Sequence, residues 1–307
     1  MRKKATSLAT GRGSRSKEKT KIILKLIKEY PKSKISEWLE IAELPKSSYY
    51  EWKIKLENPV DKDKEIRREI TSIVEESKGR YGYRRVTQVL QNKGLNVNHK
   101  RVLKIMREEF LLCTKFKTRS RKYSSYKGQI GKVANNVVNR QFKASKPNQL
   151  WLTDVTEFRI KGEEKKLYLS PILDLYNSEI ISYTLGYHPT IELTNTMLEK
   201  ALEKNRDIKD LTIHSDQGFH YQHSSWTNKL EKMNITQSMS RKGNCLDNSP
   251  MENFFGILKQ EMFYGEDFKS YEHLINDIEK YIKWYNEDRI KTKLNGMSPV
   301  MYRLHSA

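Results

Sequence analysis

Three acidic residues in the second half of the sequence are placed where their side chains could act together. Asp216 follows a short β-branched run and precedes a turn signal, which predicts the end of a strand. Glu252 follows Asn248-Ser249-Pro250, a helix-start signal that places it in the first turns of a helix. Asp154 lies inside the alternating run 150–158, which predicts another strand. Carboxylates on a strand, a strand end and a helix start are what two divalent cations require.

The chemistry of these side chains favours hard cations, because carboxylate oxygens suit Mg²⁺ or Mn²⁺. Aspartate is depleted in strands, so Asp154 has few purely structural reasons to be there. Glu252 by itself could be an ordinary acid at a helix start, stabilised by the helix dipole, and its weight comes from its place in the set. His220 and His223 have no paired cysteines beside them, so the sequence does not predict a zinc site.

Length and composition set wider limits. The chain has 307 residues, enough for two or three domains with a sizeable core. No apolar run approaches the roughly 20 residues of a membrane span, and the basic start lacks the apolar segment of a signal peptide. Cys113 and Cys245 form neither a CxxC pair nor a disulfide framework. These features predict a cytoplasmic protein.

The net charge of +20 is concentrated in the first half of the chain. Residues 1–60 carry 15 Lys and Arg against 7 Asp and Glu, and residues 61–146 carry 23 against 8. Residues 147–307 carry 20 against 23. The basic half should therefore bind a polyanion, of which nucleic acid is the first candidate. The alternative is a lysine-rich surface that serves solubility alone.

The first 57 residues predict a basic arm and a small helical domain. Residues 1–18 are basic and nearly free of large apolar side chains, so we expect a disordered arm. Apolar residues recur at helical spacing through residues 19–57, with breaks at two prolines. This layout fits a helix-turn-helix domain and also a plain three-helix bundle. Tyr49 and Tyr50, at the start of the third helix, favour DNA reading.

A second helical domain is expected over residues 60–112, followed by a basic linker over 113–146. The basic residues expected to line its DNA-binding face are Arg80, Arg84, Arg85, Lys100 and Arg101. The alternative is that these side chains only solvate the helices. The linker has scattered tyrosines and glycines and little periodicity, and we expect it to lie along DNA.

From residue 147 the pattern changes to a mixed α/β layer fold. The order of runs predicts three strands, a helix, a strand, a helix, a strand and the helix that carries Glu252. The first three strands form an antiparallel meander, and the first and fourth carry the two aspartates. We place this core at residues 147–265 and expect residues 266–307 to form a long helix and a tail that buttress it.

Several ordered motifs resemble one known family. Trp151-x-Thr-Asp-x-Thr, His214-Ser-Asp-x-Gly and Asn248-Ser-x-x-Glu resemble the DDE motifs of the retroviral-integrase superfamily, with 35 residues between the second and third acids. The chain is most similar to the OrfB transposases of copy-out, paste-in bacterial insertion sequences. The other motifs that carry this resemblance are Tyr81-Gly-Tyr-Arg-Arg, Asn98-x-Lys-Arg-Val, Tyr285-Asn-x-x-Arg and Ser298-Pro-x-x-Tyr.

The resemblance implies an RNase H-like catalytic core, a mixed five-stranded sheet with flanking helices, preceded by all-α helix-turn-helix DNA-binding domains. It implies two Mg²⁺ or Mn²⁺ ions, with Asp154 bridging both, Asp216 holding one and Glu252 the other. Lys259 lies seven residues after Glu252, on nearly the same helix face, and would contact DNA near the active site. The alternative for Lys259 is a solvated helix lysine.

Other residues near the acids have weaker signals. Arg241 and Lys242 precede the Glu252 helix in a loop and could touch the DNA backbone. Asn248 could cap this helix or orient Glu252. His214 could support Asp216 from behind, although one histidine in a strand is more often simply packed.

The expected function is therefore a DNA transposase that cleaves insertion-sequence ends and performs strand transfer with metal ions. The alternatives are a non-catalytic DNA-binding regulator, such as a decayed transposase, and a ribonuclease H. The expected partners are terminal inverted repeats and target DNA, further copies of the chain assembled on DNA, and the upstream-frame protein of the same element. Such a protein would associate with the bacterial nucleoid when bound to DNA.

Overall fold

The computed structural model describes residues 12–58, 61, 63–116, 133–205, 208–241 and 245–306. It divides into two compact units, Met1–Arg68 and Glu69–Ala307. No helix in these described ranges is long and apolar enough to cross a membrane.

The first unit contains three helices, α1 (Arg12–Glu29), α2 (Ile35–Ile41) and α3 (Lys46–Glu57). They pack around Ile23, Leu39, Leu44 and Tyr49. The three-helix layout is as expected, and it fits both a helix-turn-helix domain and a plain bundle. The expected disordered arm is wrong over residues 12–18, because α1 begins at Arg12 and not at Lys19. Residues 1–11 of that arm lie outside the described residues.

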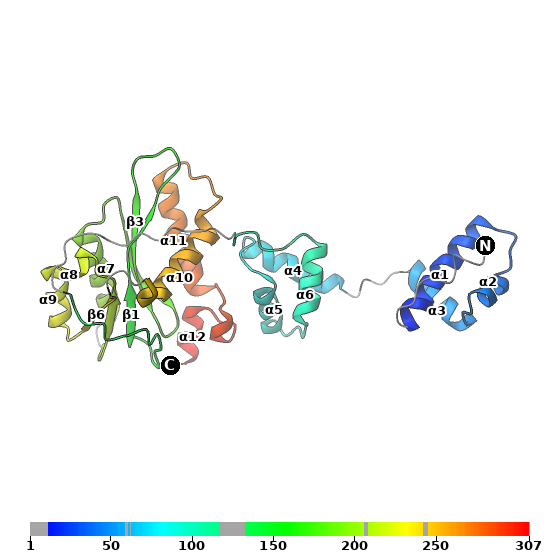
Figure 1. Ribbon diagram of the computed structural model, residues 1–307, viewed down its shortest axis with the longest axis horizontal. Coiled ribbons are helices and arrows are strands. Elements are labelled where there is room, and N and C mark those ends of the chain that lie inside the picture. Colours follow the sequence, from blue (N-terminus) through cyan, green and yellow to red (C-terminus); the bar gives the residue numbers. More distant parts are fainter. Residues whose placement is uncertain are drawn as a thin grey trace. The chain divides into compact units, whose positions relative to one another are not determined.

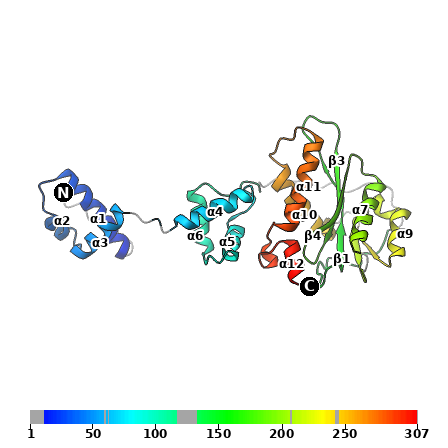
Figure 2. The same ribbon diagram turned by 180° about the vertical axis from the view of Figure 1, so that it is seen from behind.

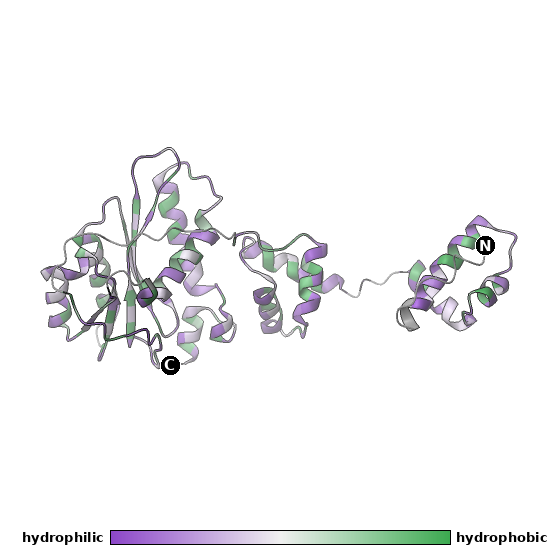
Figure 3. Cartoon of the chain, in the orientation of Figure 1, coloured by the Kyte–Doolittle hydropathy of each residue, from purple (hydrophilic) through white to green (hydrophobic). Residues whose placement is uncertain are grey.

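A second group of three helices follows, α4 (Lys64–Glu76), α5 (Tyr83–Asn92) and α6 (His99–Glu108). α5 ends where the sequence predicts, with Gly94 at a φ of 84° that a left-handed C-terminal turn requires. α6 begins at Asn98, whose side chain accepts a hydrogen bond from the Lys100 N–H. In both helices hydrophilic and hydrophobic residues alternate along the ribbon (Figure 3), which gives each one buried and one exposed side.

The core contains one mixed sheet, formed by β1 (Leu150–Thr153), β2 (Thr156–Phe158), β3 (Leu167–Asp174), β4 (Glu179–Gly186), β5 (Thr212–Ser215) and β6 (Thr236–Met239). The order is β2-β3-β1-β5-β6, with β4 also paired to β3. β3 pairs antiparallel with β1, β2 and β4, whereas β5 runs parallel to β1 and β6. The expected meander and mixed sheet are confirmed. The sheet has six strands and not five, because the run 150–158 is interrupted at Asp154 and Val155.

Helices cover both faces of the sheet (Figures 1 and 2). α7 (Ile191–Lys204), α8 (Phe219–Gln222) and α9 (Ser224–Lys232) lie on one side. On the other side lie α10 (Ser249–Leu258), which continues as the π-helical turn η3 (Lys259–Phe263), and α11 (Tyr271–Glu287). Each side has its own buried apolar cluster, so β1 and β5 are enclosed in the middle of a three-layer core.

Two expected boundaries of the core change. Val133 and Ala134 pack against the α7 side, and Val138 and Phe142 pack against the α10 side. The second part of the predicted linker therefore belongs to the core, while residues 117–132 lie outside the described residues. α11 contributes six buried side chains to the α10 side, so the core continues beyond residue 265. The short η4 (Thr292–Leu294) and α12 (Pro299–His305) complete the chain.

Candidate active site

Asp154 and Asp216 lie at the same edge of the sheet because β1 and β5 are parallel neighbours. Leu152 stands opposite His214 in the register, so the two aspartates follow the two strands at equivalent positions. Asp154 lies in the break between β1 and β2 and not within a strand as expected. Its Oδ1 accepts a hydrogen bond of 2.7 Å from the Val155 N–H, which orients the carboxylate.

Asp216 occupies the predicted strand end, directly after β5. Its Oδ1 accepts a hydrogen bond of 2.9 Å from the Gly218 N–H. A Cβ on Gly218 would lie 2.9 Å from the same Oδ1, which is too close without a shift. A larger residue at position 218 would therefore displace the Asp216 carboxylate.

Glu252 is exposed in the first turn of α10, as the helix-start signal predicts. Pro250 occupies one of the first two helical positions. Asn248 precedes the helix but its side chain does not cap it, so that expectation is wrong. Its Nδ2 donates a hydrogen bond of 3.1 Å to the Thr153 carbonyl. Asn248 therefore ties the start of the Glu252 helix to the residue before Asp154.

Asp216 and Glu252 both act electrostatically on Asp154. Burial raises the pKa of Asp154 well above its usual value, and the charges of Asp216 and Glu252 raise this pKa further. The Val155 N–H and the positive charge of Lys259 act in the opposite direction. Burial also raises the pKa values of Asp216 and Glu252. The ionised form of Asp154 is thus disfavoured both by burial and by repulsion from Asp216 and Glu252.

A cation would relieve this repulsion. In the conformation described, no group of three or more His, Cys, Asp or Glu side chains within the described ranges is arranged so that it could hold a metal ion. Bound ions would therefore have to draw the three side chains together. The donor chemistry nonetheless fits, because carboxylate oxygens are hard ligands of the kind that Mg²⁺ and Mn²⁺ prefer.

Lys259 follows α10 at the start of the π-helical turn. Its Nζ lies 5.1 Å from the centroid of the Phe158 ring, at the end of β2. Its positive charge lowers the pKa of Asp154. Its contact with DNA stays a prediction.

His214 is fully buried in β5, and both ring nitrogens are engaged. Nε2 lies 2.7 Å from the Asp247 carbonyl, and Nδ1 lies 2.9 Å from Ser238 Oγ. A carbonyl only accepts, so Nε2 carries the proton and Nδ1 accepts from the Ser238 hydroxyl. Burial lowers the pKa of His214, which agrees with a neutral ring. The His214 ring thus stabilises the backbone at Asp247, directly before Asn248, and not the Asp216 carboxylate.

Several predicted DNA-binding residues have other partners. Tyr49 is wholly buried in the first unit, so the expectation that it reads DNA is wrong, while Tyr50 is 40% exposed and stays a candidate. The Arg80 guanidinium packs on Tyr281 and Trp284 at 5.2 and 4.6 Å from the ring centroids.

Arg85 pairs with Glu261 at 3.5 Å and is 25% exposed. Arg80 and Arg85 therefore join the second helical group to the core, which argues against a place on a free DNA-binding face. Their pKa values are lowered by burial.

The remaining basic candidates keep an exposed position. They are Arg84, Lys100 and Arg101. The Tyr83 and His99 rings, 6.2 Å apart, bring the starts of α5 and α6, where these cations lie, close together. Arg241 is half exposed and makes a bidentate pair with Asp247. Lys242 lies outside the described residues.

The sequence interpretation missed four buried charges in the described residues: Asp174, Asp247, Glu261 and Arg289. Asp247 is fully buried beside Asn248, and Glu261 is 1% exposed on η3 with Arg289, also 1% exposed, as its partner. An acid directly before a helix start resembles a cap, and nothing in the local pattern indicates burial. Arg289 did belong to a recognised motif, but without a partner its role could not be inferred.

Comparison with known proteins identifies the family of this chain. Models of the integrase core domain match residues 144–245 and 252–306, and a model of an HTH-like domain matches residues 61–120. A putative transposase, InsK of insertion sequence element IS150 from Escherichia coli K12, is 42% identical over 92% of this chain and 97% of its own length. The transposase of insertion sequence element IS904 from Lactococcus lactis is 34% identical over 75% of this chain and 90% of its own length.

A solved structure of the HTLV-2 integrase catalytic core domain is also similar. It is 19% identical and has a TM-score of 0.42, covering 52% of this chain and 99% of the integrase domain. The expected integrase-type core and HTH-like helical domain are confirmed by the family models.

Proposed function

The chain belongs to the insertion-sequence transposases that carry an integrase core domain, and from this premise we propose that Asp154, Asp216 and Glu252 are its catalytic carboxylates. The observation that supports this most is the register of β1 and β5, which sets Asp154 and Asp216 at equivalent strand ends. Glu252 belongs to the same set because its charge raises the pKa of Asp154. This proposal makes the chain a DDE polynucleotidyl transferase.

Two Mg²⁺ or Mn²⁺ ions are the proposed cofactors, and Asp154, Asp216 and Glu252 would hold them. When bound, such ions lower the pKa of an attacking water and neutralise the leaving oxygen. The Val155 and Gly218 N–H groups hold the two aspartates in orientation. The proposed reaction is hydrolysis of one strand at an insertion-sequence end, then attack by the freed 3′-hydroxyl on a target phosphodiester, which forms one P–O bond and breaks another.

The proposed partners are the terminal inverted repeats and target DNA. The exposed Arg84, Lys100 and Arg101 of the HTH-like domain would contact phosphates or bases. Assembly of several copies on DNA and cooperation with an upstream-frame protein are part of the same proposal.

Strand transfer into labelled target DNA, with terminal-repeat DNA and Mg²⁺, tests the proposal. We expect Asp216→Asn to lose at least about 100-fold of the activity, because the variant lacks a charged ligand. Asp210→Asn is the matched control: Asp210 is an exposed acid just before the same strand, and its replacement should leave activity unchanged. Full activity in Asp216→Asn would contradict the proposal, and DNA binding without any metal-dependent product in the wild type would favour a regulator.

Lys259→Gln should lower strand transfer about 10-fold, mainly by raising the DNA concentration needed for half-maximal rate. The reason is the loss of a cation beside Asp154 that would pair with a DNA phosphate. The exposed Lys200 of α7 provides the control Lys200→Gln, which should behave as the wild type. A change confined to the rate at saturating DNA would contradict a role in binding.

A further inference from the structure

A fully buried carboxylate that is not one of the three proposed catalytic acids lies directly before α10. Asp247 is in the 3₁₀ turn η2 (Cys245–Asn248), directly before α10, and its side chain is 0% exposed. It accepts hydrogen bonds from Arg241 N, Nε and Nη2 at 3.0, 2.9 and 3.0 Å. Arg140 Nε donates at 2.7 Å and Asn136 Nδ2 at 3.1 Å. Two guanidinium groups on one carboxylate make a charge-assisted cluster that is costly to disturb.

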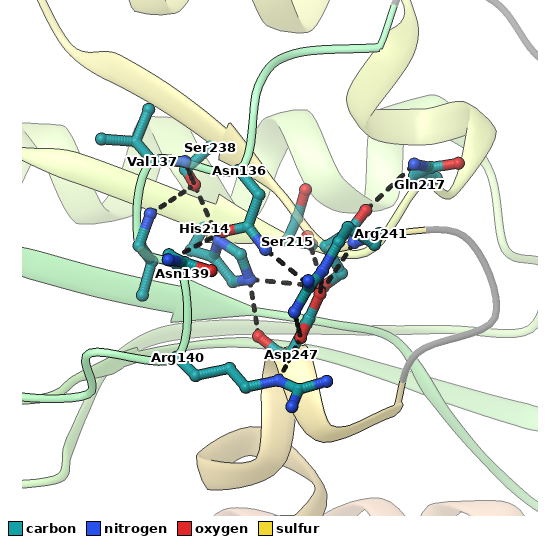
Figure 4. Close-up of polar contacts among 12 residues, drawn as sticks. Asn136, Val137, Asn139, Arg140, His214, Ser215, Gln217, Ser238, Arg241 and Asp247 are labelled. Atoms are coloured by element: carbon teal, nitrogen blue, oxygen red, sulfur yellow. Dashed lines mark hydrogen bonds and ion pairs between the residues drawn. The ribbon is translucent and has the colours of Figure 1, made fainter.

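The cluster joins three separated parts of the chain (Figure 4). Asn136 and Arg140 precede β1, Arg241 follows β6, and Asp247 precedes α10. His214 of β5 adds a fourth part by donating to the Asp247 carbonyl.

Ser238 completes the cluster on the β6 side. Its hydroxyl oxygen accepts the Val137 N–H at 3.0 Å and lies 2.9 Å from His214 Nδ1. These hydrogen bonds thereby connect four parts of the core: the segment before β1, the strands β5 and β6, and the start of α10.

Asp154 and Asp216, two of the three proposed catalytic acids, each follow a residue that is hydrogen-bonded to this cluster or to a residue beside it. Asn248, next to Asp247, donates to the carbonyl of Thr153, the neighbour of Asp154. The Ser215 carbonyl, beside Asp216, accepts from the Ser240 N–H at 2.9 Å and the Ser240 hydroxyl at 3.1 Å.

Ser240 itself lies 3.3 Å from His214 Nε2. Glu252 lies five residues after Asp247, in the first turn of α10, the helix whose start this cluster anchors.

We propose that Asp247 is a positioning residue for the catalytic carboxylates, which sets the start of α10 relative to the ends of β1 and β5. The proposal rests on the proposed function of Asp154, Asp216 and Glu252. Metal sites demand ligand placement within about 0.5 Å, and groups behind the ligands control that placement. Loss of the Asp247 charge leaves two arginines without their shared partner and lets the α10 start shift.

Asp174 offers a matched control. It is equally buried, at 0%, and also binds an arginine, with Arg303 Nη2 at 2.5 Å. Its other donors are the N–H groups of Asn148 and Tyr176. These contacts tie α12 to the end of β3 and touch none of the three acids. A purely structural role for buried carboxylates predicts the same behaviour for Asp174→Asn and Asp247→Asn.

The experiment uses the full chain and Mn²⁺ as the probe. Thermal unfolding is measured over a Mn²⁺ titration without DNA, and strand transfer is measured over the same titration. Both variants should unfold at a lower temperature than the wild type. Asp247→Asn should need about 10-fold more Mn²⁺ for half-maximal stabilisation and activity, whereas Asp174→Asn should stay within about 2-fold of the wild type.

A milder variant covers the case in which Asp247→Asn does not fold. Arg140 is 42% exposed in its side chain, and Arg140→Gln removes one partner while Arg241 remains. We expect about a 3-fold higher Mn²⁺ requirement with little loss of stability. An unchanged requirement in the folded variants, or an equal shift in Asp174→Asn, overturns the positioning role. A wild type that shows no Mn²⁺ response at all overturns the proposed function as well.

Discussion

Asp154→Asn is expected to abolish strand transfer and at the same time to stabilise the metal-free protein. Activity should fall at least about 1000-fold, because Asp154 is a proposed ligand of the ions, and a single charge-stabilising group in other enzymes already contributes about 100- to 1000-fold. The asparagine side chain keeps the shape and can still accept the Val155 N–H. The stability gain comes from removing a buried negative charge that is repelled by Asp216 and Glu252.

The stability difference should depend on pH in a defined direction. The pKa of Asp154 is raised in the folded protein, so between about 3.9, the ordinary aspartate value, and that raised value the folded chain keeps a proton that the unfolded chain has lost. Stability of the wild type therefore falls as pH rises through this window. The amide that replaces this carboxyl group does not titrate, so the advantage of the variant should be present at pH 8 and fade towards pH 4.

Thermal unfolding in EDTA from pH 4 to pH 8 measures this difference. Addition of Mn²⁺ at pH 8 should then reverse the order, because the wild type gains stability from the ions and the variant lacks a ligand. A wild type that is more stable than Asp154→Asn at pH 8 in EDTA would show that the carboxylate is not under repulsion. Asp210→Asn serves again as the control and should follow the wild type at every pH.

The sequence predicted the acids and their elements well because each has a local signal. Alternation, β-branched runs and the Asn-Ser-Pro helix start act over a few residues, and they located β5 and α10 within about two residues. The break in the first strand was not predictable, because the run 150–158 alternates without interruption. β1 ends before Asp154 because of its tertiary setting, in which the ends of β1 and β5 lie side by side.

The motifs without obvious chemistry proved to be connections between distant parts. The Tyr81 hydroxyl donates to the Asp288 carbonyl and accepts the Ile290 N–H, at 3.3 and 3.0 Å. Asn286 accepts the Ile180 N–H and donates to the Ile180 carbonyl, both at 2.9 Å. A hydrogen bond between residues more than 100 positions apart leaves no pattern in the local sequence around either residue. The same reason explains why basic side chains such as Arg80 and Arg85 were assigned to DNA.

Arg289→Met is expected to be the most destabilising of the substitutions discussed, by about 3–5 kcal/mol. Arg289 is 1% exposed and binds Glu261 through Nε and Nη2 at 2.8 and 2.6 Å. The Tyr281 hydroxyl donates to Glu261 at 2.8 Å and Arg85 lies at 3.5 Å. Without Arg289 these two cannot compensate a carboxylate whose side chain is 0% exposed. Thermal unfolding should shift down by roughly 10 °C.

The double variant Glu261→Met with Arg289→Met distinguishes two effects: the free-energy cost of a buried, unpaired Glu261 carboxylate, and the role of the pair in holding η3. Replacing both charges with apolar side chains removes the uncompensated carboxylate, so most of the lost stability should return, and the pair should show a large coupling energy. DNA affinity should not return with it. Glu261 lies two residues after Lys259 in the π-helical turn, and such turns persist where contacts outside the helix hold them.

In this chain, Glu261 on η3 is held by Arg289, Tyr281 and Arg85. Without Glu261 these contacts are lost, and we expect η3 to relax towards a regular α-helix. That change would turn Lys259 away from Asp154. A stable double variant with about a 10-fold lower DNA affinity, similar to Lys259→Gln, is the expected result. Full DNA affinity in that variant would mean that the π-turn holds Lys259 without the buried pair.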